Sequence, residues 1–266
     1  SYALNTGLRI SGTNSLELLG DFCSATVRTN YLMFENGLYI PRTAAGLPAT
    51  SFNRIGTLQN GTPRLALFAD FPGSLTVDAV PGGFVSDQYS TGFAAYGGDR
   101  TVSFKDGAKL ITNERVPSSG SFYYISKAGN ILSFGSSDSD GTIRFVNPFE
   151  INGGKQIFAF DSPAEVEVKL LGEISRSSTT ECRLYFNKLG CEGTIELLGQ
   201  NTYGANSVAG PVVSHLRGGR LLVSGSLTNH LVEIGQGYYT YDKTLYSVSI
   251  LAGTGTVACT VNVYSN

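Results

Sequence analysis

Residues 164–199 read AEVEVKLLGEISRSSTTECRLYFNKLGCEGTIELLG, and this stretch decides the fold class. From Glu165 to Leu170, charged and aliphatic residues alternate, which is the period of a strand with one face in water and one on a core. The same alternation returns in residues 182–186 and 194–198. No segment between residues 161 and 199 has the length and the 3.6-residue period of a helix. The stretch therefore predicts an antiparallel meander of strands.

The composition of the whole chain favours an all-β protein. Only 15% of the 266 residues are charged, against about 25% in ordinary soluble domains. The chain contains 33 glycines, 14 tyrosines and 15 phenylalanines, and it has no tryptophan. Many short strands joined by tight turns require this combination of little charge, many turn-forming residues and evenly spread aromatic residues.

Two turn signals predict hairpins. Asn36-Gly37 stands between the apolar residues 31–34 and 38–40, and Asn-Gly tolerates the positive φ that a two-residue hairpin turn needs. Near the end of the chain, strands over 245–251 and 257–264 are expected to form a hairpin about residues 252–256. The second of these strands would carry Val257, Cys259, Val261 and Val263 on one face.

The predicted fold is an antiparallel β-sandwich, jelly-roll-like, with two β-rich units in tandem. Residues 1–155 form the expected N-terminal β-rich domain, and residues 156–266 form the expected C-terminal sandwich. The second unit carries eight or nine expected strands at a spacing of about ten residues, a pattern that suits a jelly roll.

A weak internal echo occurs three times, at residues 16–20, 168–172 and 195–199, each time as an apolar strand that ends in Leu-Leu-Gly or Leu-Gly. The spacing between the three copies is not constant, which argues against a solenoid. We interpret the echo as a common way for a strand to end, in preference to a duplication.

Charge and hydropathy exclude two classes of partner. The formal net charge is −2 and no cluster of Lys and Arg is present, so nucleic-acid binding is not expected. No apolar run approaches the roughly 20 residues of a membrane helix, so no membrane span is expected. Residues 1–4 lack the basic and apolar blocks of a signal peptide. The expected location is a virion or the extracellular space.

The four cysteines are too few for a disulfide scaffold. Cys182 and Cys191 are nine residues apart and could pair, whereas Cys23 and Cys259 are remote in sequence. Because cysteine is often buried and behaves as a small apolar residue, we favour buried thiols and leave the disulfide state of Cys182 and Cys191 open.

No residue set predicts catalysis, a metal or a cofactor. The two histidines, His215 and His230, are not part of a nucleophile elbow, and with the scattered cysteines they show no zinc spacing. Glu165 and Glu167 share their face with Lys169, as on a solvated strand. We therefore expect a protein that is not an enzyme.

The acidic loop at residues 136–147 partly resembles a calcium loop. Asp138, Asp140 and Gly141 stand at matching offsets, but Ser136 replaces the first Asp and Asn147 replaces the last Glu. We interpret the loop as a polar turn and not as a metal site.

Aromatic residues are the remaining binding candidates. Tyr238, Tyr239, Tyr241 and Tyr246 could stack on sugar rings or pack against a partner, because tyrosine buries area and keeps a hydroxyl group for bonding. Each could equally bridge core and solvent at the end of a strand.

In general character the chain resembles β-sandwich proteins of viral and phage particles, because it combines little charge, glycine-punctuated strands and few cysteines. The resemblance implies a structural protein of a capsid, decoration, head-fibre or tail, which forms homo-oligomers and contacts other virion proteins. The alternative is a carbohydrate-binding or adhesive β-sandwich module, including receptor binding, in which the same tyrosines face a glycan.

Overall fold

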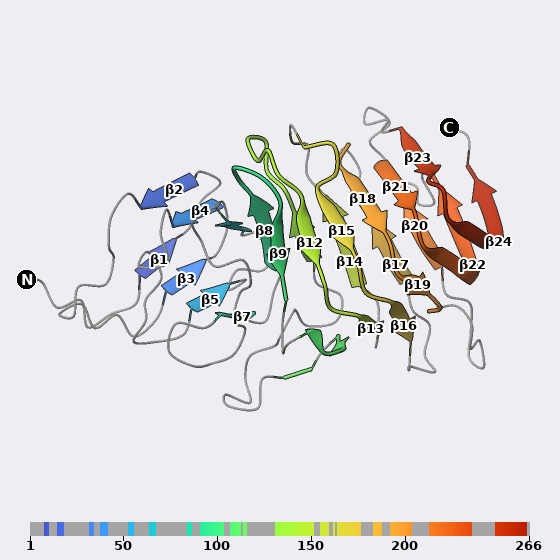
Figure 1. The fold of residues 1–266 in the computed structure, drawn as a ribbon, viewed down its shortest axis with the longest axis horizontal. Helices are drawn as coiled ribbons and strands as arrows, with labels where there is room; N and C mark the ends of the chain where they lie inside the picture. The colour runs from blue at the N-terminus through green and yellow to red at the C-terminus, as the bar shows by residue number, and fades with distance from the viewer. Residues whose placement is uncertain are drawn as a thin grey trace, which may run out of the picture.

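The computed structural model places strands that run parallel to one another in four sheets and form a β-solenoid of about four turns. Figure 1 shows the strands stacked side by side from the N-terminal to the C-terminal end of the molecule. The structure describes residues 8–10, 15–18, 32–34, 38–41, 53–55, 64–67, 84–86, 91–103, 107–112, 114–115, 131–151, 155–159, 162, 164–176, 183–187, 192–203, 213–235 and 248–264. No helix in these ranges is long and apolar enough to span a membrane.

Two sheets run through the C-terminal half, and a third borders them. Sheet B contains β2 (Ser15–Leu18), β4 (Leu38–Pro41), β6 (Arg64–Leu67), β8 (Thr91–Ala95), β11 (Ile131–Phe134), β14 (Lys155–Ala159), β17 (Arg183–Phe186), β20 (Val213–Leu216), β22 (Ser226–Ile234), β24 (Thr256–Val263) and the short β19 (Gln200–Asn201), which pairs with β22. Sheet C contains β9 (Arg100–Val102), β12 (Ile143–Phe145), β15 (Val168–Leu170), β18 (Thr194–Leu197), β21 (Gly219–Val223) and β23 (Ser249–Ala252). Sheet D contains β10 (Leu110–Ile111), β13 (Phe149–Ile151) and β16 (Ile174–Arg176).

At the N-terminal end, sheet A takes the place of sheets C and D. It contains β1 (Leu8–Ile10), β3 (Leu32–Phe34), β5 (Asn53–Ile55) and β7 (Phe84–Ser86). The chain there alternates between sheet A and sheet B, so the two ends of the solenoid are bounded by different pairs of sheets.

One turn of the solenoid, which we call a rung, carries one strand in each of sheets B, C and D from β8 to β16, and the later rungs have no strand in sheet D. The chain passes from β14 to β15 to β16 and then returns to sheet B at β17. Each strand pairs with its equivalent in the next rung, so Val168 of β15 pairs with Ile195 of β18 and Ile195 pairs with Leu221 of β21. A parallel pair needs such a long connection because the chain must return to the same end of the sheet.

The predicted antiparallel, jelly-roll-like sandwich is therefore wrong. Alternation within β15 is as expected, since Val168 and Leu170 are buried and Lys169 is partly exposed. However, alternation has a period of two in parallel and antiparallel strands alike, and it does not say which strand is the partner. Here the partner lies one rung away and not next in the chain.

Both predicted hairpins are wrong for the same reason. β3 and β4 flank Asn36-Gly37, but β3 pairs with β1 and β5 whereas β4 pairs with β2 and β6. Likewise, β23 pairs with β21 and β24 pairs with β22. In both places the chain passes from one sheet to another and does not fold back on its own strand.

The Leu-Leu-Gly echo marks equivalent corners of successive rungs. Residues 168–170 and 195–197 pair in register, and each segment leads to a glycine, Gly172 or Gly199, at the end of its sheet C strand. A Cβ on Gly199 would overlap the carbonyl oxygen of Gly172, and a Cβ on Gly225 would overlap that of Gly199. Glycine is needed at these corners because the backbones of neighbouring rungs approach closely. The inference that unequal spacing argues against a solenoid was therefore wrong, although residues 16–18 of the echo lie in β2 of sheet B and not in sheet C.

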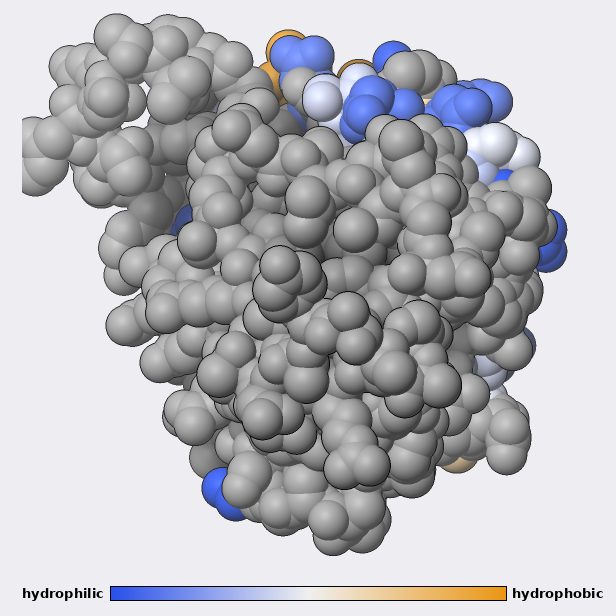
Figure 2. Space-filling model, turned by 90° about the vertical axis from the view of Figure 1, so that its left-hand side faces the viewer, coloured by the Kyte–Doolittle hydropathy of each residue, from blue (hydrophilic) through white to orange (hydrophobic). Residues whose placement is uncertain are grey.

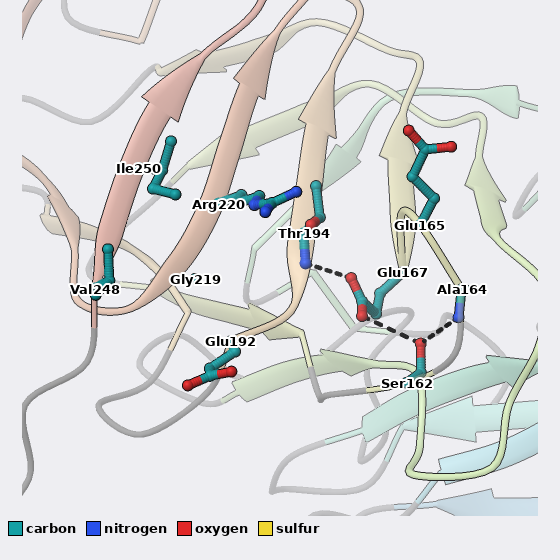
Figure 3. Close-up of a pocket in the computed structure, with 10 residues that line it drawn as sticks. All are labelled: Ser162, Ala164, Glu165, Glu167, Glu192, Thr194, Gly219, Arg220, Val248 and Ile250. Carbon is teal, nitrogen blue, oxygen red and sulfur yellow. Dashed lines mark hydrogen bonds between the residues drawn. The ribbon is translucent and has the colours of Figure 1, made fainter.

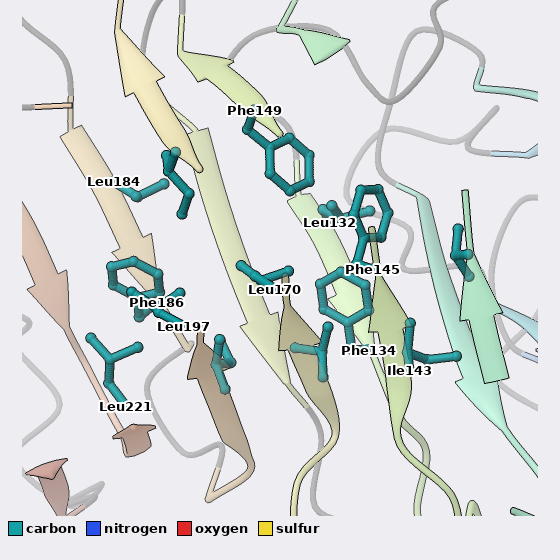
Figure 4. Close-up of a cluster of buried hydrophobic side chains, with 14 of the residues drawn as sticks. Leu132, Phe134, Ile143, Phe145, Phe149, Leu170, Leu184, Phe186, Leu197 and Leu221 are labelled. Carbon is teal, nitrogen blue, oxygen red and sulfur yellow. The ribbon is translucent and has the colours of Figure 1, made fainter. Parts of the chain in front are cut away.

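The core lies between the sheets and consists of aliphatic and aromatic side chains stacked from rung to rung. Figure 4 shows Phe134, Phe145 and Phe149 together, with Leu170, Leu184 and Leu197 on one side of them and Ile143 on the other. The rings of Phe145 and Phe149 are stacked with centroids 4.9 Å apart, and Phe134 meets Phe145 edge to face at 6.1 Å. These three rings belong to one rung, formed by β11, β12 and β13, and they are at most 2% exposed.

Buried asparagines join the rungs where the chain turns. Asn201 accepts a hydrogen bond from Ile174 N at 3.0 Å and donates to Gly199 O and Ser226 O at 2.9 and 3.0 Å. Asn187, at φ 58°, donates to Gly193 O and Gly218 O, both at 2.8 Å. An asparagine amide can satisfy backbone groups of several rungs at once because it has both donors and an acceptor.

Sheet B passes through the expected domain boundary, since β14 pairs with β11 before it and β17 after it. The division into residues 1–155 and 156–266 stays a prediction. Strands expected at residues 74–80, 121–126 and 238–241 fall outside the described residues.

Candidate functional site

A cavity of about 480 Å³ opens beside the start of the sheet C strands, near the C-terminal end. Figure 3 shows side chains from four successive rungs around it. Two exposed carboxylates, a guanidinium, a hydroxyl and two aliphatic groups border the cavity, and they belong to Glu165, Glu192, Arg220, Thr194, Val248 and Ile250. The hollow therefore combines acceptors, donors and apolar surface.

The register of sheet C builds the floor of this cavity. Thr194 of β18 pairs with Arg220 of β21, and Arg220 pairs with Ile250 of β23. Equivalent residues on parallel strands point to the same face and lie about 4.8 Å apart from one strand to the next. A hydroxyl, a guanidinium and an aliphatic side chain thus stand in one row along the solenoid.

Glu167 forms a fixed wall of the cavity. Its carboxylate accepts hydrogen bonds from Ser162 Oγ at 3.1 Å and from the backbone N–H of Thr194. Its backbone is also paired on both sides, with Ile143 and with Thr194. Glu167 is only 3% exposed. Its contacts join three successive rungs at the rim of the cavity.

The expectation that Glu165 and Glu167 share a solvated face is wrong for Glu167. Glu165 is exposed and Glu167 is buried, because regular strand begins only at Val168. The irregular backbone before β15 allows the second carboxylate to turn toward the next rung. Lys169 does face solvent, 3.5 Å from Glu196 of the neighbouring strand.

A second polar cluster lies on the outer face of sheet B. His215 Nδ1 is 2.8 Å from Glu233 Oε2, and the His215 ring stacks on Tyr185 with centroids 4.7 Å apart. The hydroxyl of Tyr264 donates to Glu233 Oε1 at 2.9 Å, and the Arg217 guanidinium lies 4.4 Å above the Tyr185 ring. These contacts link β17, β20, β22 and the end of β24. The side chain of His230 falls outside the described residues.

The acidic loop expected to be a polar turn packs against residues 96–100 of the preceding rung. The Tyr96 hydroxyl donates to Asp138 Oδ1 at 2.7 Å, and Gly97 N donates to Asp140 Oδ1 at 2.7 Å. Burial opposes ionisation of Asp138, but hydrogen bonds from Tyr96 and Ser136 outweigh it and lower the pKa of the carboxyl. Both aspartates of the loop thus take part in contacts between rungs.

Among the residues that the structure describes, no group of three or more His, Cys, Asp and Glu side chains is placed to hold a metal ion. Asn147, at the position of the bidentate Glu in a calcium loop, is buried and donates to Ala108 O at 2.7 Å. Its amide nitrogen therefore serves the backbone of a neighbouring rung.

The sequence-predicted binding residues Tyr238, Tyr239, Tyr241 and Tyr246 lie outside the described residues and stay a prediction. Cys182 and Cys191 also lie outside them, so their pairing stays open, while Cys259 is a free thiol on β24 whose pKa is raised by burial. The cavity itself was missed, because Thr194, Arg220 and Ile250 are far apart in sequence. Aligning the Leu-Leu-Gly segments at residues 168–172 and 195–199 could have placed Glu167 beside Thr194, but not Arg220 or Ile250.

Comparisons of the chain with protein-family models, with curated proteins and with solved structures found no match. The functional interpretation therefore depends on the geometry of the solenoid itself.

Proposed function

We propose that this protein is a non-enzymatic structural protein that acts through oligomerisation, as a component of a viral or phage particle. The observation that carries this proposal is the C-terminal rung, formed by β23 and β24. Its aliphatic side chains are exposed, with Val248 at 74% and Val263 at 72%. Stacked repeats need a polar cap at their ends to stay soluble, and these residues are not polar.

In addition to these exposed side chains, β24 has a backbone edge that no described strand pairs with. Thr256 N and Tyr264 N donate toward the β22 side of β24. Because successive N–H groups of a strand point to opposite edges, the amides of Val257, Cys259, Val261 and Val263 point to the other edge. No strand among the described residues pairs with that edge. An open strand edge is a template for pairing with another chain.

Exposed apolar side chains gather at the C-terminal rung among the residues that the structure describes. Figure 2 views the molecule from its N-terminal side, and the coloured residues along the upper rim are mainly hydrophilic. Most of the exposed large apolar side chains of the described residues belong instead to β23, β24 and the residues next to them. An exposed apolar patch of this kind marks an interaction surface.

A second copy of the same chain is the partner that we infer for this surface. Sheets A and B bound the N-terminal end, whereas sheets B and C bound the C-terminal end. Head-to-tail stacking would therefore place unlike cross-sections together. Two C-terminal rungs related by a two-fold axis are identical, and their β24 edges would meet antiparallel.

The titratable side chains support a structural and not a catalytic role. Glu167, His215 with Glu233, and Asp138 each take part in contacts that join neighbouring rungs. Assembly of such rigid solenoids into a particle, with other virion proteins, is the setting we propose.

Light scattering of the purified protein over a concentration series tests the proposal. The wild type is expected to reach the mass of a dimer, and Val261→Lys is expected to stay monomeric because its charge would stand in the exposed apolar face of β24, next to the paired edge. Leu198→Lys, which places the same charge on an exposed apolar position of an inner rung, is the matched control and should not change the mass. A wild type that stays monomeric at every concentration would contradict the proposal.

A further inference from the structure

We propose that the cavity bordered by Glu165, Glu192, Thr194, Arg220 and Ile250 binds a neutral oligosaccharide. The cavity shares Val248 and Ile250 with the exposed end of the solenoid but no residue with the edge of β24, so this inference goes beyond self-association. Its volume of about 480 Å³ falls in the range of small-molecule sites, roughly 300 to 1,000 Å³.

The polar groups around the cavity fit hydroxyl groups. A hydroxyl group both donates and accepts, so it can donate to the carboxylates of Glu165 and Glu192 and accept from the guanidinium of Arg220. Hydrogen bonds in which one partner is charged are the stronger ones. All three charged side chains are exposed and reach the cavity from different rungs.

The charges select against anionic and purely apolar ligands. Three carboxylates, including that of Glu167, border the cavity together with one guanidinium. A phosphate or another anion would therefore be repelled more than attracted. A purely apolar ligand would remove these charges from water without replacing their hydrogen bonds, which is costly. A neutral ligand with many hydroxyl groups has neither cost.

The apolar part of the cavity completes the match. Ile250 follows Arg220 in the row across sheet C, and Val248 lies beside it at the rim. These aliphatic side chains can pack against the C–H groups of a sugar ring. The row runs along the solenoid from Thr194 through Arg220 to Ile250, and its length suits a short oligosaccharide better than a single sugar.

The rim is held in place before any ligand binds. Ser162 and Thr194 both donate hydrogen bonds to the buried carboxylate of Glu167, which fixes the backbone that carries Glu165 and Thr194. A site that is already ordered loses less conformational entropy when it binds.

Saturation-transfer NMR with maltotriose, cellotriose and chitotriose tests the proposal, with spermine and inorganic phosphate as charged probes. At least one trisaccharide is expected to bind, and Arg220→Gln and Glu165→Gln should each weaken that binding by at least tenfold. Arg144→Gln changes an exposed arginine on the same face of sheet C, outside the cavity, and should leave binding unchanged.

The outcomes separate this site from the proposed assembly. Light scattering of Arg220→Gln should give the same mass as the wild type, since Arg220 is not on the β24 edge. Absence of trisaccharide binding at millimolar concentration would overturn the inference. Binding of spermine or phosphate in place of the sugars, or equal weakening by Arg144→Gln, would overturn it as well.

Discussion

The neighbouring strands β22 and β24 are the longest of the described strands, and they pair in parallel register but have different surroundings. Leu227 and Val232 of β22 are fully buried, whereas their partners Val257 and Val261 of β24 are 38% and 39% exposed. Both strands carry aliphatic side chains at equivalent positions. The difference shows that a strand of this solenoid is buried by the rungs on both sides of it and not by its own sequence.

Matched substitutions of register partners should give the largest difference between inner and terminal rungs. Leu221 of β21 is fully buried and pairs with Leu251 of β23, which is only partly buried. Leu221→Ala should lower the free energy of unfolding by about 3 kcal/mol, because it leaves a cavity in the core. Leu251→Ala should cost less than half as much. Urea denaturation measures the free energy of unfolding of both variants. Equal losses would contradict the difference between inner and terminal rungs.

The glycine corners should give the next largest effect. A methyl group at Gly199 would overlap the backbone of the preceding rung, so Gly199→Ala should destabilise the protein by about 2 kcal/mol. The neighbouring Leu198 is exposed, and Leu198→Ala should change stability by no more than about 0.5 kcal/mol. Thermal unfolding followed by circular dichroism measures both, and a fully stable Gly199→Ala variant would contradict the close stacking of rungs.

At alkaline pH, the ionisation of a buried tyrosine should distinguish an inner rung from the terminal rung. Burial raises the pKa of Tyr203, which is fully buried and hydrogen bonded to Ser214 Oγ at 2.6 Å. The unfolded chain loses this proton near pH 10 and the folded chain keeps it, so stability should fall above pH 10. Above pH 10 the free energy of unfolding should fall by about 1.4 kcal/mol per pH unit. Below pH 10 this tyrosine is protonated in both states, so it adds no pH dependence there.

The terminal rung supplies the control for this slope. The hydrogen bond that Tyr264 donates to Glu233 raises its pKa, but the side chain is exposed. Tyr203→Phe should therefore flatten the alkaline loss of stability, while Tyr264→Phe should change it little. Urea unfolding between pH 9 and pH 11 measures the slopes, and equal slopes in Tyr203→Phe and the wild type would contradict the assignment.

Much of the strand content followed from the sequence, whereas the pairing did not. Strands were expected at residues 182–186, 194–198 and 257–264, and β17, β18 and β24 occupy these places. Alternation and glycine are local signals, so they locate a strand but do not name its partner. Register partners in this solenoid lie from 18 residues apart, as for Val213 and Leu231, to 43 residues apart, as for Arg100 and Ile143, so the sequence shows no constant period.

The candidate site could not be predicted because no local motif encodes it. Its polar row joins Thr194, Arg220 and Ile250, which become neighbours only through the rung register. The role of Glu167 was also hidden, because a carboxylate in an alternating segment looks solvated when its partner strand is unknown. The Leu-Leu-Gly segments at residues 168–172 and 195–199 did hold the register, and aligning them would have placed Glu167 beside Thr194.

Hydrogen exchange of the β24 amides at low and high protein concentration tests the central claim most directly. The claim is that a second copy closes the edge of β24 that no described strand occupies. The account predicts that Val257, Cys259, Val261 and Val263 gain protection as concentration rises, while the amides that already face β22 change little. Protection of these four amides that does not depend on concentration would contradict it.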